Sequence, residues 1–181
     1  MKTSIAMATY NGAKYLQEQL DSFAAQTRVP DELVICDDHS SDATVATLSR
    51  FAQTASFNVR IVVNDVNLGF VQNFERALSL CKGDLIFLSD QDDVWFDSKI
   101  EEIVRYMEEN PRYLVVTNDQ IITDADLIPI GSVMANIRTG GFEPSYLVAG
   151  CCTAIRRAWL DVALPVHRPV TTIGSANWPI L

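Results

Sequence analysis

Short apolar segments alternate with amphipathic ones along the first 117 residues of the chain. The apolar segments contain few polar side chains, which is typical of strands that are covered on both faces of a parallel sheet. The segments between them repeat apolar residues at intervals of three and four, which predicts helices with one buried side. The predicted strands are residues 4–9, 33–36, 60–63, 85–88 and 113–117. The pattern therefore predicts an α/β fold, a mostly parallel sheet with helices on both faces.

The alternation weakens after residue 125, where glycine and proline become frequent up to an apolar run at residues 146–155. This punctuation is typical of loops. No repeat, low-complexity tract or linker separates the two parts. We therefore expect a single domain with a regular part, residues 1–125, and a less regular part, residues 126–181.

The net charge of the chain limits the kinds of partner that it can bind. The chain of 181 residues has a formal net charge of −9, and all but two of its 23 acidic residues lie before residue 127. Such a charge repels phosphate backbones, so we expect no nucleic acid partner. With 48% hydrophobic and 20% charged residues, the composition excludes a disordered chain.

The four cysteines show no C-x-x-C spacing, and three lie in apolar runs, so they are predicted to be reduced thiols in or near the core rather than a metal set. The N-terminus lacks the apolar region of a signal peptide, and no uncharged run reaches the ~18 apolar residues of a membrane span. We expect a cytoplasmic protein without a transmembrane segment.

An acidic cluster follows the fourth predicted strand. Residues i and i+2 of an extended backbone point the same way, so Asp90 and Asp92 are expected to converge on one cation, with Asp93 beside them. A few hard oxygen ligands suit Mg²⁺ or Mn²⁺ completed by water and a phosphate. The alternative is a solvated acidic turn that caps the helix beginning near Asp97.

Two further polar segments follow the first and second strands. Asp37 and Asp38 offer carboxylates to a donor such as a nucleobase imide or a ribose hydroxyl. Helix capping is the alternative, although Ser41 or Asp42 suffices for it. In the segment Thr9-Tyr10-Asn11-Gly12, the tyrosine beside a tight turn offers a ring face for stacking.

Taken in order, these segments resemble the nucleotide-binding half of family 2 glycosyltransferases, which have a GT-A-type fold. The resemblance covers about residues 3 to 160 and is carried by residues 8–12, 34–42, 67–69 with Asn73, and 88–95. The Asp-Gln-Asp-Asp-Val-Trp form of the last segment is most similar to the rhamnosyltransferase-type branch. That similarity implies a dTDP-linked deoxysugar donor such as dTDP-rhamnose.

The resemblance implies a metal-dependent, inverting transferase. It would move a sugar from a dTDP- or UDP-linked donor to a saccharide or lipid-linked saccharide acceptor, in the cytoplasm or at the inner face of the membrane. Residues 1–125 would be its nucleotide-sugar-binding part and residues 126–181 the incomplete start of its acceptor-binding part. The implied nucleotide-binding residues are Thr9, Tyr10, Asn11, Asp37 for the ribose, Asp38 for the base imide, Gly69, Asn73 and Asp90, and the implied ligands of Mg²⁺ or Mn²⁺ are Asp90 and Asp92.

The general base is where the chain departs from the family pattern. In the family an Asp or Glu beyond the apolar, glycine-rich stretch takes the proton of the acceptor hydroxyl. After residue 126 the chain offers only Glu143 and Asp161, and neither is assigned this role. We expect that the chain stops before the base and does not carry out transfer by itself.

Three other functions stay open at this point. The segment Asp90–Val94 also fits the Asp-x-Asp pattern of haloacid-dehalogenase-type phosphatases, although three strand-helix units precede it and no acidic pair follows. A receiver-like signalling module would need a late-strand lysine, and Lys99 is the last lysine. A sugar-nucleotide-binding domain without turnover would explain the missing base.

Overall fold

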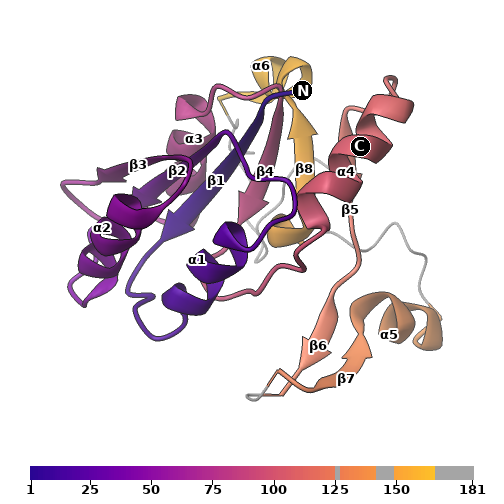
Figure 1. The fold of residues 1–181 in the computed structure, drawn as a ribbon, viewed down its shortest axis with the longest axis horizontal. Coiled ribbons are helices and arrows are strands. Elements are labelled where there is room, and N and C mark those ends of the chain that lie inside the picture. Colours follow the sequence, from indigo (N-terminus) through magenta and orange to yellow (C-terminus); the bar gives the residue numbers. More distant parts are fainter. Residues whose placement is uncertain (125–126, 142–148, 166–181) are drawn as a thin grey trace, which may run out of the picture.

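The computed structural model describes residues 1–124, 127–141 and 149–165. A six-stranded sheet lies at its centre, with the strand order β3-β2-β1-β4-β8-β5 (Figure 1). β1 pairs in parallel with β2 and β4, β2 pairs in parallel with β3, and β8 is antiparallel to both β4 and β5. Five of the six strands therefore run in the same direction. The strands are β1 (Thr3–Thr9), β2 (Glu32–Asp37), β3 (Asn58–Val63), β4 (Leu85–Ser89), β5 (Val115–Thr117) and β8 (Thr153–Arg156).

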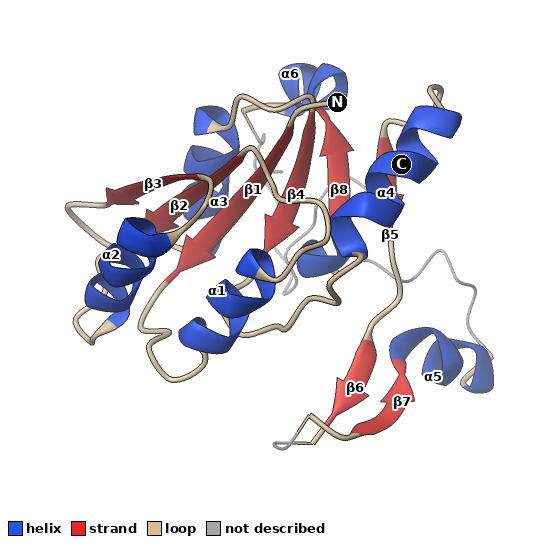
Figure 2. Ribbon diagram, in the orientation of Figure 1, coloured by secondary structure: helices blue, strands red, loops and turns tan. Residues whose placement is uncertain are grey.

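Helices cover both faces of this sheet (Figure 2). The first face packs against α1 (Leu16–Ala24), α2 (Thr44–Thr54) and α4 (Lys99–Glu109). The opposite face packs against α3 (Phe70–Leu80) and α6 (Arg157–Ala163). This arrangement explains why the central strands are apolar throughout, since both of their faces are buried.

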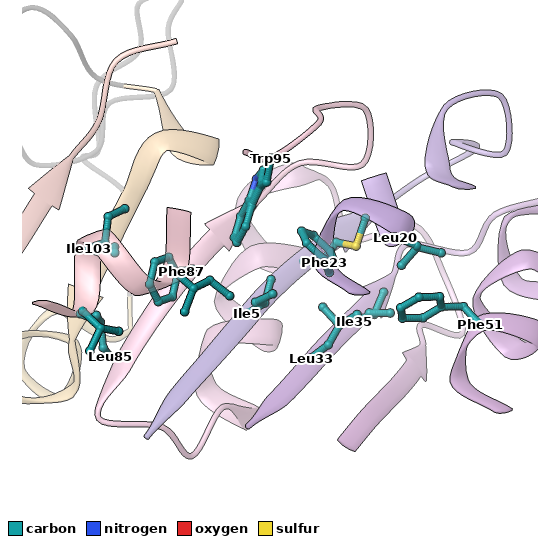
Figure 3. Close-up of a cluster of buried hydrophobic side chains, with 14 of the residues drawn as sticks. Ile5, Leu20, Phe23, Leu33, Ile35, Phe51, Leu85, Phe87, Trp95 and Ile103 are labelled. Carbon is teal, nitrogen blue, oxygen red and sulfur yellow. The ribbon is translucent and has the colours of Figure 1, made fainter. Parts of the chain in front are cut away.

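Alternation along the strands divides the core into two layers. In β1, Ile5 and Met7 join the cluster under α1, α2 and α4, whereas Ala6 joins the cluster under α3 and α6. In the first cluster the large side chains of Phe23, Phe87 and Trp95 lie together, with the rings of Phe23 and Trp95 4.8 Å apart (Figure 3). Trp95 is thus a core residue of the segment that follows β4.

A small antiparallel hairpin lies away from the sheet (Figure 1, lower right). It consists of β6 (Ile121–Thr123) and β7 (Pro129–Ser132), and α5 (Val133–Thr139) follows it directly. Ser132 caps this helix, because its hydroxyl accepts a hydrogen bond from the backbone N–H of Ala135. Ile128 and Ile130 are exposed on the hairpin.

The expected α/β fold with a mostly parallel sheet is confirmed, and the five predicted strands are present with small shifts at their ends. The sequence pattern did not predict β8, which inserts between β4 and β5 from more than thirty residues further along the chain. It also missed β6, β7 and α5, because elements of three to seven residues are too short to show a period. Among the described residues, no helix is long and apolar enough to cross a bilayer.

Candidate functional site

The loops that follow β1, β2 and β4 meet at the carboxyl edge of the sheet, where open α/β sheets bind their ligands. Gln91 joins two of them: its amide oxygen accepts a hydrogen bond from the Tyr10 N–H at 2.8 Å, and its amide nitrogen donates to the Tyr10 carbonyl at 3.2 Å. Asn11 joins the third, because its side-chain oxygen accepts from the Ser41 N–H at 2.9 Å. The three polar segments singled out in the sequence therefore form one connected edge.

Asp37 is a buried residue whose carboxylate links β1 to the loop after β2. Its carboxylate accepts hydrogen bonds from the Thr9 hydroxyl at 2.8 Å and from the Ser40 backbone N–H at 2.9 Å and hydroxyl at 2.6 Å. Neither Asp37 nor Thr9 is more than 2% exposed. In this structure both side chains connect β1 to the loop after β2, and their predicted contact with a nucleotide stays a prediction.

Asp38 organises the turn that leads into α3. Its carboxylate accepts from the backbone N–H groups of Leu68 at 2.7 Å and Gly69 at 2.8 Å, and from the Asn64 side chain at 2.7 Å. Gly69 has a φ of +84°, a conformation in which glycine avoids the strain of a Cβ. A carboxylate has about four acceptor sites, so these three donors leave one unfilled on a residue that is 2% exposed, and its contact with a base stays a prediction.

Asn73 lies behind this turn and is only 2% exposed. Its side-chain nitrogen donates to the Cys36 carbonyl at 2.8 Å, and its oxygen accepts from the Asn64 side chain at 2.9 Å. Asn73 thus fixes α3 against β2 and supports the Asp38 turn. The structure places it underneath the edge instead of on the open side of it.

Tyr10 is the exposed member of the edge. The residue is 51% exposed, and it directly precedes Asn11, whose φ of +49° marks a tight turn. The backbone on both sides of the ring is fixed by the Gln91 and Ser40 contacts, since the Asn11 N–H donates to the Ser40 hydroxyl at 2.8 Å. A positioned, accessible ring of this kind suits base stacking.

The acidic cluster after β4 differs from the geometry expected from the sequence. β4 ends at Ser89, so Asp90 and Asp92 lie in the loop that follows the strand and not in the strand itself. The residues whose ligand atoms lie within 4.8 Å of one another are Asp90, Asp93 and Cys151. Asp92 is exposed and is not part of this group. Its role as a metal ligand stays a prediction.

Negative charge is poorly compensated in this cluster. Burial, together with the neighbouring Asp93 and Asp92 carboxylates, raises the pKa of Asp90 from 3.8 to about 6. Burial and Asp93 also raise the pKa of Asp92. One carboxylate oxygen of Asp93 is buried without a hydrogen-bond partner among the described residues. Partly buried carboxylates that repel one another are suited to binding a divalent cation, because its positive charge offsets their repulsion.

Lys99 connects the cluster to the segment before β8. Its ammonium lies 3.8 Å from the centroid of the Trp95 ring and donates to the Cys151 carbonyl at 2.8 Å. Burial lowers the pKa of Lys99 to about 8. This contact docks the 3₁₀ turn Gly150–Cys152 against the start of α4.

Sequence reasoning missed Gln91, Lys99 and Cys151 as parts of this edge. Gln91 had a signal, since it lies between two candidate ligands in the motif. Lys99 and Cys151 had none, because their contact depends on β8 returning beside β4. The four cysteines are buried and free, as predicted.

Of the two acids considered as general base, Asp161 lies away from this edge. In the β4–β8 register Leu85 pairs with Arg156, so α6 begins at the amino end of β4 and carries Asp161 to the opposite edge of the sheet. Arg157 also lies there and donates to the Cys81 carbonyl at 2.7 Å. Glu143 lies outside the described residues.

Replacing Gly12 by alanine tests the contact between the loops that follow β1 and β4. A Cβ at this position would overlap the side-chain amide of Gln91. We expect Gly12→Ala to displace that amide and cost about 1–2 kcal/mol of unfolding free energy, the value of its two hydrogen bonds to Tyr10. Urea denaturation of Gly12→Ala, Gln91→Ala and the double variant measures this loss. The two single changes should not add; full additivity would contradict the contact.

Comparison with known proteins places the chain in a family. The family model described as glycosyl transferase family 2 matches residues 4–162. The protein named UDP-Glc:alpha-D-GlcNAc-diphosphoundecaprenol beta-1,3-glucosyltransferase WfgD, from Escherichia coli, is 28% identical over 125 residues, covering 69% of this chain and 48% of the relative. The chain spans about a third to a half of the length of the curated relatives it matches.

Two solved structures share the fold. S. aureus TarS 1-349 in complex with UDP has a TM-score of 0.68 at 21% identity, over 90% of this chain and 48% of that one. The mannosyltransferase PcManGT from Pyrobaculum calidifontis, in complex with GDP-Man and Mn2+, has a TM-score of 0.70 at 20% identity, over 89% and 46%. The extent of the family match and the shared architecture lead to one conclusion: this chain belongs to glycosyl transferase family 2.

Proposed function

We propose that the protein takes part in transferring a sugar from a UDP- or dTDP-linked donor to a saccharide or lipid-linked saccharide acceptor, with inversion at the anomeric carbon. One observation carries the proposal. The exposed Tyr10 ring, the partly satisfied Asp38 carboxylate and the acidic cluster around Asp90 lie along one sheet edge, and Gln91 ties the first and last of these loops together. Such an edge offers an aromatic face for stacking of a base, a carboxylate that accepts a hydrogen bond from the base imide, and a site for a cation.

The nucleotide half of the proposal follows from these contacts. The base stacks on Tyr10, and its imide N–H donates to the free acceptor site of Asp38. Thr9, Asn11 and Gly69 shape the two turns on either side, Asp37 supports the ribose side, and Asn73 fixes the floor. Uracil and thymine bring a single ring N–H donor to this edge, which matches one remaining acceptor site, whereas guanine brings two donors, so we propose a pyrimidine nucleotide.

Asp90 and Asp92 are proposed to hold Mg²⁺ or Mn²⁺ against the diphosphate. The unbalanced negative charge at Asp90 supports this assignment, and so does the Mn2+ that accompanies GDP-Man in the complex of the mannosyltransferase PcManGT. A bound divalent cation stabilises the charge that develops on the departing nucleoside diphosphate. The segment after β4 further supports a dTDP-deoxysugar, such as dTDP-rhamnose, as the donor.

Nucleotide binding without turnover is the second candidate. It is favoured by the position of Asp161, which lies at the edge opposite Asp90. Release of free nucleotide from a UDP- or dTDP-sugar in the presence of saccharide acceptors would favour the transferase. Tight binding with no release would favour the second candidate.

Calorimetric titration of UDP, dTDP and GDP, each with and without Mn²⁺, tests the nucleotide site. We expect Mn²⁺-dependent binding of UDP or dTDP and at least about tenfold weaker binding of GDP, because guanine brings two donors, N1–H and the N2 amine, to a carboxylate with one acceptor site left, so one donor loses its partner. Equal affinity for all three nucleotides would contradict the role of Asp38. Binding that is indifferent to Mn²⁺ would contradict the cation site.

A further inference from the structure

A thiol lies at the acidic cluster. The Cys151 sulfur and carboxylate oxygens of Asp90 and Asp93 are all within 4.8 Å of one another, although Cys151 is about sixty residues away along the chain. The position of the thiol is fixed from two sides. Lys99 donates to the Cys151 carbonyl at 2.8 Å, and the Gln120 amide nitrogen donates to the sulfur itself at 2.8 Å.

A buried oxygen of Asp93 is a second observation that points to a ligand at this cluster. One of its carboxylate oxygens is fully buried and has no hydrogen-bond partner among the described residues. A buried polar atom left in this way costs free energy, so an unpartnered oxygen on a residue of this cluster indicates a site for an electron-pair acceptor. Asp93 is not one of the two residues proposed to bind Mg²⁺ or Mn²⁺.

The donor set determines which cation fits. Magnesium prefers oxygen ligands in a nearly ideal octahedron, whereas a thiolate is a soft ligand that selects Zn²⁺ and related ions. Cys and Asp are both normal ligands of Zn²⁺, which takes three protein ligands and a fourth from solvent in open sites. Asp90, Asp93 and Cys151 supply three such ligands.

We propose that Asp90, Asp93 and Cys151 form a thiophilic cation site that takes Zn²⁺, Cd²⁺ or Co²⁺ and shares Asp90 with the proposed Mg²⁺ or Mn²⁺ site. On coordination the Cys151 thiol releases its proton to solvent, and two carboxylates and a thiolate then face the divalent ion. Their combined charge of −3 exceeds the positive charge of the nearby Lys99 ammonium.

A regulatory consequence follows, and it rests on the proposed function. Because Asp90 belongs to both sets, an ion held by Cys151 withdraws this carboxylate from the Mn²⁺-nucleotide complex. Thiophilic ions therefore inhibit nucleotide binding, and the inhibition depends on a thiol that the nucleotide itself does not require.

Cobalt spectroscopy of the full chain tests the site without any nucleotide. Thiolate coordination gives Co²⁺ a charge-transfer band in the near ultraviolet. We expect this band in the wild-type protein, its loss in Cys151→Ser, and its retention in Cys81→Ser, a buried thiol at the end of α3. The Cd²⁺ affinity of Cys151→Ser should fall by about tenfold or more, a scale reached even by changes in outer-shell partners.

Further variants make the result decisive. Asp93→Asn should also lose Cd²⁺ affinity, and Cys152→Ser, which alters the neighbouring thiol of the same turn, should keep the band. Circular dichroism confirms that each variant is folded. A wild-type protein without the band, or a band that survives in Cys151→Ser, overturns the proposal, whichever variants fold.

Competition calorimetry separates this inference from the proposed function. Zn²⁺ should weaken Mn²⁺-dependent UDP binding by about tenfold or more in the wild type and by less than about twofold in Cys151→Ser. Equal inhibition of the two proteins overturns the shared use of Asp90. If no nucleotide binds but the cobalt band is present, the proposed function fails while the thiophilic site stands.

Discussion

Replacing Asp38 by alanine is expected to lower the free energy of unfolding by about 4 kcal/mol. The side chain is 2% exposed and accepts hydrogen bonds from the Leu68 and Gly69 backbone and from Asn64. Its removal leaves three donors without their acceptor, at about 1–3 kcal/mol for each donor that water does not reach. The loss is expected to concentrate at the start of α3, because Gly69 is the residue that precedes this helix.

Two matched variants accompany this change. Asp65→Ala removes a carboxylate from the exposed loop after β3 and should change stability by less than about 0.5 kcal/mol. Asp38→Asn keeps the volume but turns one acceptor oxygen into a donor that faces a backbone N–H, so it should recover only part of the loss. Urea denaturation measures all three variants. An Asp38→Asn protein as stable as the wild type would show that the carboxylate does not hold the turn.

Asp38 holds the turn before α3 and is also proposed to bind the base, and the Asp38→Asn variant separates these two roles. If its free acceptor site receives the base imide, Asp38→Asn weakens UDP binding even under conditions in which the variant is fully folded. Loss of stability with unchanged UDP affinity would restrict Asp38 to the internal role that the hydrogen bonds describe.

The carboxyl edge was predictable because parallel strands with buried runs must end together. The polar residues that follow β1, β2 and β4 therefore fall at one edge. Tyr10 and Asn11 are adjacent in the sequence. Asp38 follows β2 and Gly69 comes after β3, so their contact follows from the pairing of these two strands. The burial of Asp38 was not predictable from the sequence. Carboxylates are rarely buried unless they are paired, and the partners of Asp38 are backbone N–H groups whose positions depend on the turn before α3.

The geometry of the acidic cluster was harder to predict for two reasons. The expectation for Asp90 and Asp92 assumed that the backbone after the strand stays extended, whereas the ligand atoms that lie close together belong to Asp90, Asp93 and Cys151. The thiol was missed because β8 is a short antiparallel strand whose place between β4 and β5 is decided by pairing far along the chain. A cysteine in an apolar run was correctly predicted to be buried, but its neighbours could not be read from that run.

Replacing Asp90 by asparagine is expected to have opposite effects on nucleotide binding and on stability. Asp90 belongs to both proposed cation sets, so the variant should lose about a hundredfold in Mn²⁺-dependent UDP affinity, the upper end of the range seen for changes around metal sites. Asp92→Asn should lose affinity as well if the exposed carboxylate reaches the cation. An Asp90→Asn protein that binds UDP and Mn²⁺ as tightly as the wild type would contradict the site.

In the metal-free protein the same change should stabilise the fold. Burial raises the pKa of Asp90 to about 6, from 3.8, so between these values the folded state binds more protons than the unfolded state, and stability falls as the pH rises. Asparagine carries no charge, so it removes the cost in stability of ionising the Asp90 carboxyl in the folded protein. At pH 7.5 in a chelator, Asp90→Asn should exceed the wild type by about 1–2 kcal/mol, a range reduced for solvent screening of a partly exposed group.

The pH dependence distinguishes electrostatic repulsion from better packing. At pH 4 the carboxyl is largely protonated in the folded wild type, so the advantage of the variant should nearly vanish, whereas a packing effect would persist at both values. Denaturation curves at pH 4 and pH 7.5, repeated with Mn²⁺, decide between them. Saturating Mn²⁺ stabilises only the protein that binds it, so it should reverse the order of the two proteins at pH 7.5, because the cation compensates the charge that asparagine removes.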